Sequence, residues 1–157
     1  MPDIQRLSQS LIKHGLSIAV AESATSGLVG YLLSSLPGSS RYFLGGVIAY
    51  ANDAKRTLLD VPDSAFDKGA VSAEVAGAMA SNIRRLLNAD IGISDTGIAG
   101  PGGATETKPV GLFYIAISTR DGHEVIRECH FGADRNENRR AAVDEMLSLA
   151  QEYLDDH

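Results

Sequence analysis

The sequence has very little cysteine: one residue, Cys129, among 157. A single thiol cannot form an internal disulfide, so the fold has to be stable without a covalent cross-link. Cys129 lies in the alternating stretch 124–131, which is typical of a strand. We interpret it as a structural thiol rather than a nucleophile, because buried free cysteine behaves as a small hydrophobic residue.

Long hydrophobic runs and an excess of basic residues are also absent. No segment reaches the ~18 apolar residues of a membrane span, and residues 1–6 lack the basic-then-apolar order of a secretory signal. We therefore expect a cytoplasmic protein that does not bind membranes. The formal net charge of −6 argues against extended binding of nucleic acid, although one phosphate group could still occupy a local basic pocket.

Histidine is scarce and scattered, which excludes two common kinds of site. One cysteine and four histidines at distant positions offer no metal-ligand spacing, so we expect no metal. None of the histidines is expected beside a serine at the carboxyl end of a strand, which argues against a serine–histidine triad. The four are His14, His123, His130 and His157.

The pattern of apolar residues predicts alternating helices and strands within one domain, residues 1–157. Expected strands cover 16–20, 46–50, 91–95, 110–118 and 124–131. Expected helices cover 4–14, which Gly15 ends, and 28–36; others follow Asn52 as a cap, Ser72 as a cap, and the Asp134–Glu137 capping pattern. This order predicts an α/β fold, a three-layer α/β/α sandwich with a mixed, mostly parallel five-stranded sheet.

A serine follows the first expected strand in the segment Glu22-Ser23-Ala24-Thr25-Ser26-Gly27. Ligands of open α/β sheets bind beyond the carboxyl ends of the strands. A hydroxyl at this junction can act as a nucleophile, and neighbouring backbone N–H groups can hold an oxyanion. The alternative is that Ser23 is only the N-cap of the next helix.

A tyrosine and a lysine, Tyr50 and Lys55, follow the second expected strand. Lysine can replace histidine as the base of a nucleophilic serine if burial lowers its pKa enough. The alternative is a solvated lysine on the surface.

A glycine-rich loop, Thr96 to Gly103, follows the third expected strand. Four glycines in eight residues allow backbone amides to approach a ligand closely. The sequence fits neither a Walker P-loop nor a dinucleotide fingerprint. Ligand contact and an ordinary flexible loop are both compatible with it, and the position beyond a strand favours contact.

Three arginines, Arg135, Arg139 and Arg140, begin the last expected helix, where the helix dipole disfavours cations by ~0.3–1 kcal/mol each. An anionic ligand would compensate, and the forked guanidinium suits phosphate. Pairing with Asp134 and Glu137 is the alternative.

Together these segments resemble the C-terminal domain of the competence/damage-inducible protein CinA family. The resemblance covers nearly the whole chain. Its most specific part is the run from Thr96 to Pro101 with Lys108-Pro109-Val110-Gly111. The family usually reads Glu-Ser-Cys-Thr-Gly-Gly at the serine, so Ala24 and Ser26 are departures, and the missing thiol argues against a cysteine mechanism.

The resemblance implies an anticodon-binding-domain-like fold, often dimeric, and cofactor-free deamidation of nicotinamide mononucleotide, a step in pyridine-nucleotide recycling. The family's serine, lysine and tyrosine map onto Ser23, Lys55 and Tyr50. A non-catalytic nucleotide-sensing or partner-binding domain, and an amidase for another small amide, are the alternatives. We expect the substrate to be bound by Glu22, Thr25, Ser26, Gly27, Thr96, Gly97, Gly100, Gly102, Arg139 and Arg140.

Overall fold

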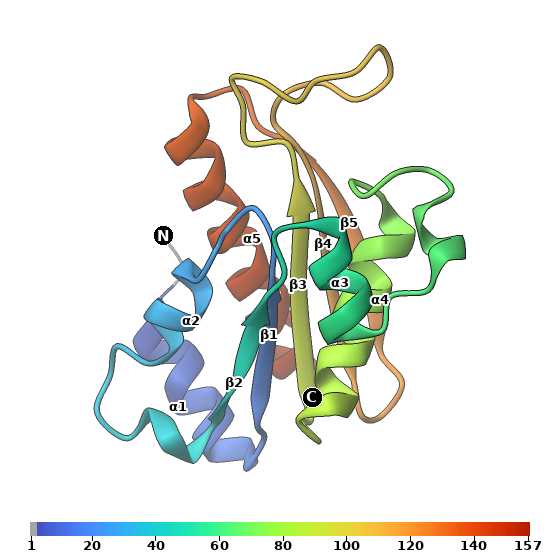
Figure 1. Ribbon diagram of the computed structural model, residues 1–157. Coiled ribbons are helices and arrows are strands. Elements are labelled where there is room, and N and C mark those ends of the chain that lie inside the picture. The colour runs from blue at the N-terminus through green and yellow to red at the C-terminus, as the bar shows by residue number, and fades with distance from the viewer. Residues whose placement is uncertain (1–2) are drawn as a thin grey trace.

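The computed structural model describes residues 3–157 and contains a five-stranded sheet (Figure 1). The strands lie in the order β2-β1-β3-β4-β5. β1 pairs in parallel with β2 and β3, whereas β4 is antiparallel to β3 and β5. Four strands therefore run in one direction, which confirms the predicted mixed sheet. The strands are β1 (Ile18–Glu22), β2 (Phe43–Ile48), β3 (Ile91–Gly97), β4 (Leu112–Thr119) and β5 (Glu124–His130).

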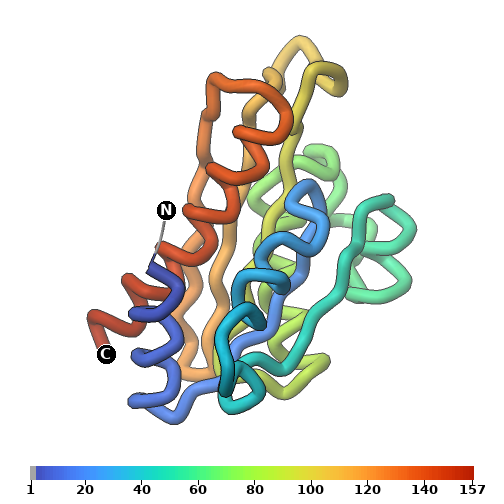
Figure 2. Tube along the Cα trace, turned by 90° about the vertical axis from the view of Figure 1, so that its left-hand side faces the viewer, coloured from blue at the N-terminus to red at the C-terminus, as the bar shows by residue number. Residues whose placement is uncertain are grey.

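Helices cover both faces of this sheet, which confirms the three layers. α1 (Ile4–His14), α2 (Leu28–Leu33) and α5 (Arg135–Asp155) lie together on one face, in front of the sheet in Figure 2. α3 (Asn52–Leu59) and α4 (Ala73–Leu86) lie on the other face. Two short 3-10 turns, Ser39–Arg41 and Asp63–Phe66, connect the elements.

Several helix ends follow the predicted capping chemistry. Gly15 ends α1 in the left-handed conformation, and the side chains of Ser72 and Asp134 accept hydrogen bonds from the first turns of α4 and α5. Asn52, however, is not a cap: it is the first residue of α3, and Ala51 takes the cap position without a side-chain bond.

Several element boundaries differ from the sequence prediction. β1 begins at Ile18 and continues through Glu22, and β2 ends at Ile48, so Tyr50 lies beyond the strand. α2 ends at Leu33 rather than at residue 36. Apolar periodicity locates an element but not its last residues, which depend on pairing with neighbouring strands.

Burial reflects the position of each strand in the sheet. All five residues of β1 are buried, because parallel neighbours flank the strand and helices cover both its faces. The edge strand β5 instead alternates between exposed and less exposed positions. Among residues 3–157, no helix has both the length and the apolar character of a membrane span.

Candidate active site

A pocket of about 310 Å³ opens at the carboxyl ends of β1 and β3. The segments after β1, β2 and β3 meet there with the start of α5, as expected where ligands bind in open α/β sheets. The pocket is lined by Ser23, Ala24, Tyr50, Asn52, Lys55, Ala70, Val71, Thr96, Gly97, Ile98, Ala99, Gly100, Gly102, Gly103 and Arg135.

Ser23 directly follows β1 and lines the pocket, although the residue is only 7% exposed. It is not a helix N-cap, because α2 begins at Leu28 and Gly27 takes the cap position. The N-cap alternative is therefore wrong, and the serine hydroxyl is not committed to a helix end.

The backbone amides after Ser23 are arranged differently from the expectation. The Thr25 N–H donates to Asp95 Oδ2 and the Ser26 N–H donates to Ser23 O, so both amides are already used. The Ala24 N–H donates no hydrogen bond within residues 3–157, and Ala24 lines the pocket. Ala24 is therefore the residue of this segment that can supply an oxyanion donor. Thr25, Ser26 and Gly27 do not line the pocket.

Lys55 is a buried lysine that lines the same pocket as Ser23. The residue is 2% exposed, and its Nζ donates a hydrogen bond to Tyr50 O at 3.0 Å. Burial lowers the pKa of Lys55, and the negative charge of Asp95 partly opposes this effect. The surface-lysine alternative is therefore wrong. Within residues 3–157, no direct hydrogen bond joins Lys55 Nζ to Ser23 Oγ.

Tyr50 contributes to the site mainly through its backbone carbonyl, which accepts from Lys55. The residue itself is 58% exposed, and its hydroxyl accepts a hydrogen bond from Arg135 at 3.0 Å. The hydroxyl thus lies at the pocket mouth and is engaged with an arginine, whereas the carbonyl fixes the amine.

The glycine-rich loop lines the pocket. Thr96 Oγ1 donates to Ala70 O at 2.8 Å, which ties the start of the loop to the segment before α4. The N–H groups of Gly100, Gly102 and Gly103 make no hydrogen bonds within the described residues, so they are available to a ligand. Gly100 has φ +88°, a conformation that other residues rarely adopt.

The three arginines of α5 have different surroundings. Arg135 lines the pocket and donates to both Gly100 O and Tyr50 Oη. Arg139 donates through Nε to Ala24 O at 2.9 Å, so it holds the serine segment. The side chain of Arg140 is 64% exposed and pairs with Glu137 at 2.9 Å, the alternative that the sequence had left open.

Two buried carboxylates support the serine segment from behind. Glu22 accepts from the N–H groups of Val29 and Gly30, both at 3.0 Å, and it does not line the pocket. Asp95 accepts from Ser23 and Thr25. The sequence analysis missed Asp95. The available signal was an acidic residue at the end of an apolar strand, directly before the glycine-rich loop.

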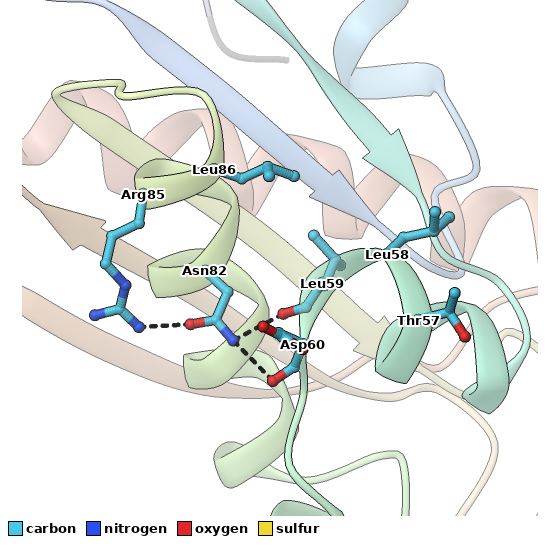
Figure 3. Close-up of a pocket in the computed structure, with 7 residues that line it drawn as sticks. All are labelled: Thr57, Leu58, Leu59, Asp60, Asn82, Arg85 and Leu86. Atoms are coloured by element: carbon cyan, nitrogen blue, oxygen red, sulfur yellow. Dashed lines mark hydrogen bonds between the residues drawn. The ribbon is translucent and has the colours of Figure 1, made fainter.

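A larger hollow of about 580 Å³ lies between α3 and α4 (Figure 3). Its wall contains one cation and one carboxylate, Arg85 and Asp60, beside exposed leucines. The amide of Asn82 bridges the two helices by donating to Leu59 O at 2.8 Å. Its lining has no serine or cysteine and no buried base, so the chemistry favours the smaller pocket. Its lining residues are Thr57, Leu58, Leu59, Asp60, Asn82, Arg85 and Leu86.

Residues 3–157 contain no group of three or more His, Cys, Asp or Glu side chains placed to hold a metal ion. The pocket lining offers a serine hydroxyl, a buried amine, the Arg135 guanidinium and backbone donors.

Residues 3–154 match the CinA C-terminal domain family. The chain belongs to this family. A CinA-like protein from Desulfotalea psychrophila is 48% identical over 151 residues, which are 96% of this chain and 36% of that protein. A putative competence-damage inducible protein from Halothermothrix orenii is 46% identical over 98% of this chain and 37% of its own length. The chain thus spans about a third of the length of these curated relatives.

Solved structures of the family have the same fold. The competence/damage inducible protein CihA from Agrobacterium tumefaciens is 36% identical, with a TM-score of 0.90 over 99% of this chain and 97% of that one. A CinA superfamily protein from Klebsiella pneumoniae is 28% identical, with a TM-score of 0.93 over 98% and 96% of the two chains.

Proposed function

We propose that this domain hydrolyses the carboxamide of nicotinamide mononucleotide, giving nicotinic acid mononucleotide and ammonia. The observation that carries the proposal is Lys55: a buried amine with a lowered pKa that lines the same pocket as Ser23. Burying an amine is costly, and a base poised near neutral pH is what activation of a serine requires.

In the proposed mechanism, Lys55 Nζ takes the proton of Ser23 Oγ as Oγ attacks the carboxamide carbon. The Ala24 N–H, which makes no hydrogen bond within the described residues, would donate to the developing oxyanion; one such donor is worth ~3–4 kcal/mol in known enzymes. The lysinium then returns its proton to the departing nitrogen, so ammonia leaves and an acyl-serine remains. Water, deprotonated by the same amine, hydrolyses the ester and restores Ser23.

The hydrogen bond from Nζ to Tyr50 O orients the amine through these steps. The proton transfers therefore involve Ser23 and Lys55, while the Tyr50 hydroxyl accepts a hydrogen bond from Arg135.

The donors at the mouth of the pocket support the proposed substrate class. Arg135 and the free amides of the glycine-rich loop lie together, an arrangement suited to phosphate and ribose oxygens. A volume of about 310 Å³ is at the lower end of small-molecule sites, typically ~300–1,000 Å³. Binding energy from the phosphate would then orient the amide at Ser23.

The test is ammonia release from nicotinamide mononucleotide by the unmodified chain and by Ser23→Ala, Lys55→Ala and Lys55→Arg. All three variants are expected to lose activity, because a guanidinium cannot lose its proton near neutral pH. Lys13→Ala, at an exposed lysine of α1, is the matched control and should retain full activity. Near-normal turnover by Ser23→Ala would refute the nucleophile assignment.

Substrate choice is tested by comparing the mononucleotide with free nicotinamide. Arg135→Ala should raise KM for the mononucleotide and leave the weak reaction of nicotinamide unchanged. Equal rates with both amides would instead indicate an amidase for another small amide. Thermal stabilisation by the mononucleotide without product would indicate a non-catalytic nucleotide-binding domain.

A further inference from the structure

Asp95 is a fully buried carboxylate directly behind the segment that carries Ser23. It lies on β3, two residues before the strand ends at Gly97. Its Oδ1 accepts from the Ser23 N–H at 2.9 Å, and its Oδ2 accepts from the Thr25 N–H at 3.2 Å. One side chain therefore holds the backbone on both sides of Ala24, whose free amide lines the pocket.

Other contacts also hold the serine segment: Arg139 Nε donates to Ala24 O at 2.9 Å, and the Leu28 N–H donates to Thr25 O at 3.1 Å. The segment is a turn rather than a helix, held locally by the Ser26 N–H donating to Ser23 O at 3.2 Å. Without Asp95, the buried amides of Ser23 and Thr25 would lose their acceptor, and an unpaired buried N–H group is unfavourable. The position of the serine hydroxyl thus depends on a residue 72 positions away in the sequence.

The Thr25 hydroxyl lies between two carboxylates, 2.6 Å from Asp95 Oδ1 and 2.7 Å from Glu22 Oε1. A hydroxyl has one proton, so it can donate to only one of them. The second short contact is favourable only when one carboxyl group carries a proton. Burial, and to a smaller extent the charge of Glu22, raises the pKa of Asp95 to about 6, so Asp95 takes that proton under mildly acidic conditions.

The negative charge of Asp95 also acts on the base of the proposed reaction, because it opposes the lowering of the Lys55 pKa by burial. The charged groups around Asp95 are Glu22 from β1 and Lys55 from α3, while Arg139 of α5 reaches the same segment at Ala24 O. Burial alone would make Lys55 a weak base, since an amine with a strongly lowered pKa holds a proton poorly. The negative charge of Asp95 opposes this lowering of the Lys55 pKa. It also stabilises the lysinium that forms when Ser23 is deprotonated.

We propose that Asp95 is a positioning residue of this site, which fixes the backbone of Ser23 and supplies the negative charge that keeps Lys55 an effective base. This role rests on the proposed amide hydrolysis. Asp95 does not line the pocket, so it acts through Ser23 and Lys55 rather than on the substrate.

The experiment compares Asp95→Asn with Asp90→Asn. Asp90 is a matched control because it makes the same kind of tether at the other end of β1, where its Oδ2 accepts from the N–H and Oγ of Ser17 at 2.9 and 3.0 Å. Two readouts are measured. The first is the pH profile of kcat/KM, and the second is the NMR signal of lysine side chains labelled with ¹³C at Cε, followed as a function of pH. The chain has only four lysines, so the Lys55 signal can be assigned with Lys55→Arg.

For Asp95→Asn we expect the plateau of kcat/KM to fall roughly 100-fold, as for a small misplacement of a reacting group. The acid limb of the profile and the Lys55 signal should both move to lower pH, because loss of a negative charge disfavours the lysinium. Asp90→Asn should change neither midpoint. An unchanged Lys55 midpoint in Asp95→Asn would overturn the proposal even if activity were lost, since a purely structural role predicts that result.

Two further arms keep the proposal testable. If Asp95→Asn does not fold, the NMR signals of the Ser23 and Thr25 amides and of the Lys55 side chain are followed against pH in the unmodified chain. These signals should shift at the same pH as the Asp95 carboxyl group titrates. The absence of a common step would overturn the positioning role of Asp95. If the unmodified chain releases no ammonia, amide hydrolysis fails, while the Lys55 and amide titrations still decide the role of Asp95.

Discussion

The buried carboxyl group of Asp95 should make the free energy of unfolding depend on pH in an unusual direction. Its pKa is about 6 in the folded protein, against 3.8 for an unperturbed aspartate. The folded state therefore binds this proton more tightly than the unfolded state. The stabilisation is fully present at pH values below the pKa of Asp95 in the unfolded chain. It is lost as the pH rises through the pKa of Asp95 in the folded protein.

The magnitude follows from these two pKa values. Proton linkage gives a loss of about 2 kcal/mol between pH 4 and pH 7, out of a total of about 3 kcal/mol whose remainder is lost below pH 4. For a chain of this size, 2 kcal/mol corresponds to roughly 4–8 °C in Tm. Near neutral pH Asp95 is ionised and this stabilisation is absent. The loss is consistent with a residue kept for its position and charge rather than for stability.

The assay is urea denaturation of the unmodified chain and of Asp95→Asn at several pH values from 4 to 7. The unfolding free energy of the unmodified chain minus that of the variant should fall by about 2 kcal/mol over this range. Asp90→Asn should instead give an almost constant difference over this range. Hydrogen bonds from Ser17 and Arg120 lower the pKa of Asp90 despite its partial burial, so its contribution is lost only at pH values below the ordinary aspartate pKa of 3.8. A flat difference for Asp95→Asn would refute the reasoning.

Three other predictions concern packing and backbone strain. Gly97→Ala should destabilise the chain by ~1–3 kcal/mol in urea denaturation, because the new Cβ would lie 2.2 Å from Phe113 Cδ1, whereas Gly102→Ala, with no atom within 4 Å, should have little effect. Ser26→Gly should stabilise the chain by about 1 kcal/mol, because Ser26 has φ +48°, and an unchanged Tm would contradict this. Burial raises the pKa of the Cys129 thiol to about 11, so iodoacetamide at pH 7.5 should modify it only after denaturation; rapid modification of the folded chain, followed by mass spectrometry, would count against a structural thiol.

Much of the architecture could be predicted because apolar periodicity is a local signal. The order of helices and strands, the mixed sheet and the caps at Gly15, Ser72 and Asp134 follow from residues within a few positions of one another. The ends of β1, β2 and α2 could not be predicted in the same way, because strand pairing and helix packing decide them.

The candidate site was only partly predictable. The segments at Ser23, Lys55 and Thr96–Gly103 were identified because each follows a strand, and parallel strands bring such segments to one edge of the sheet. The arginines were harder to separate, since three lie within six positions. Only the direction in which each side chain leaves α5 places Arg135 at the pocket, Arg139 at the serine segment and Arg140 beside Glu137.

The sequence by itself determined the class of fold, the absence of a disulfide and the segments that could carry chemistry, because these depend on composition and short-range pattern. Tertiary structure alone decided that Lys55 is buried and that Asp95 holds Ser23. Both are consequences of long-range packing: a side chain's solvation, and with it its pKa, is set by residues that only the folded chain brings near it.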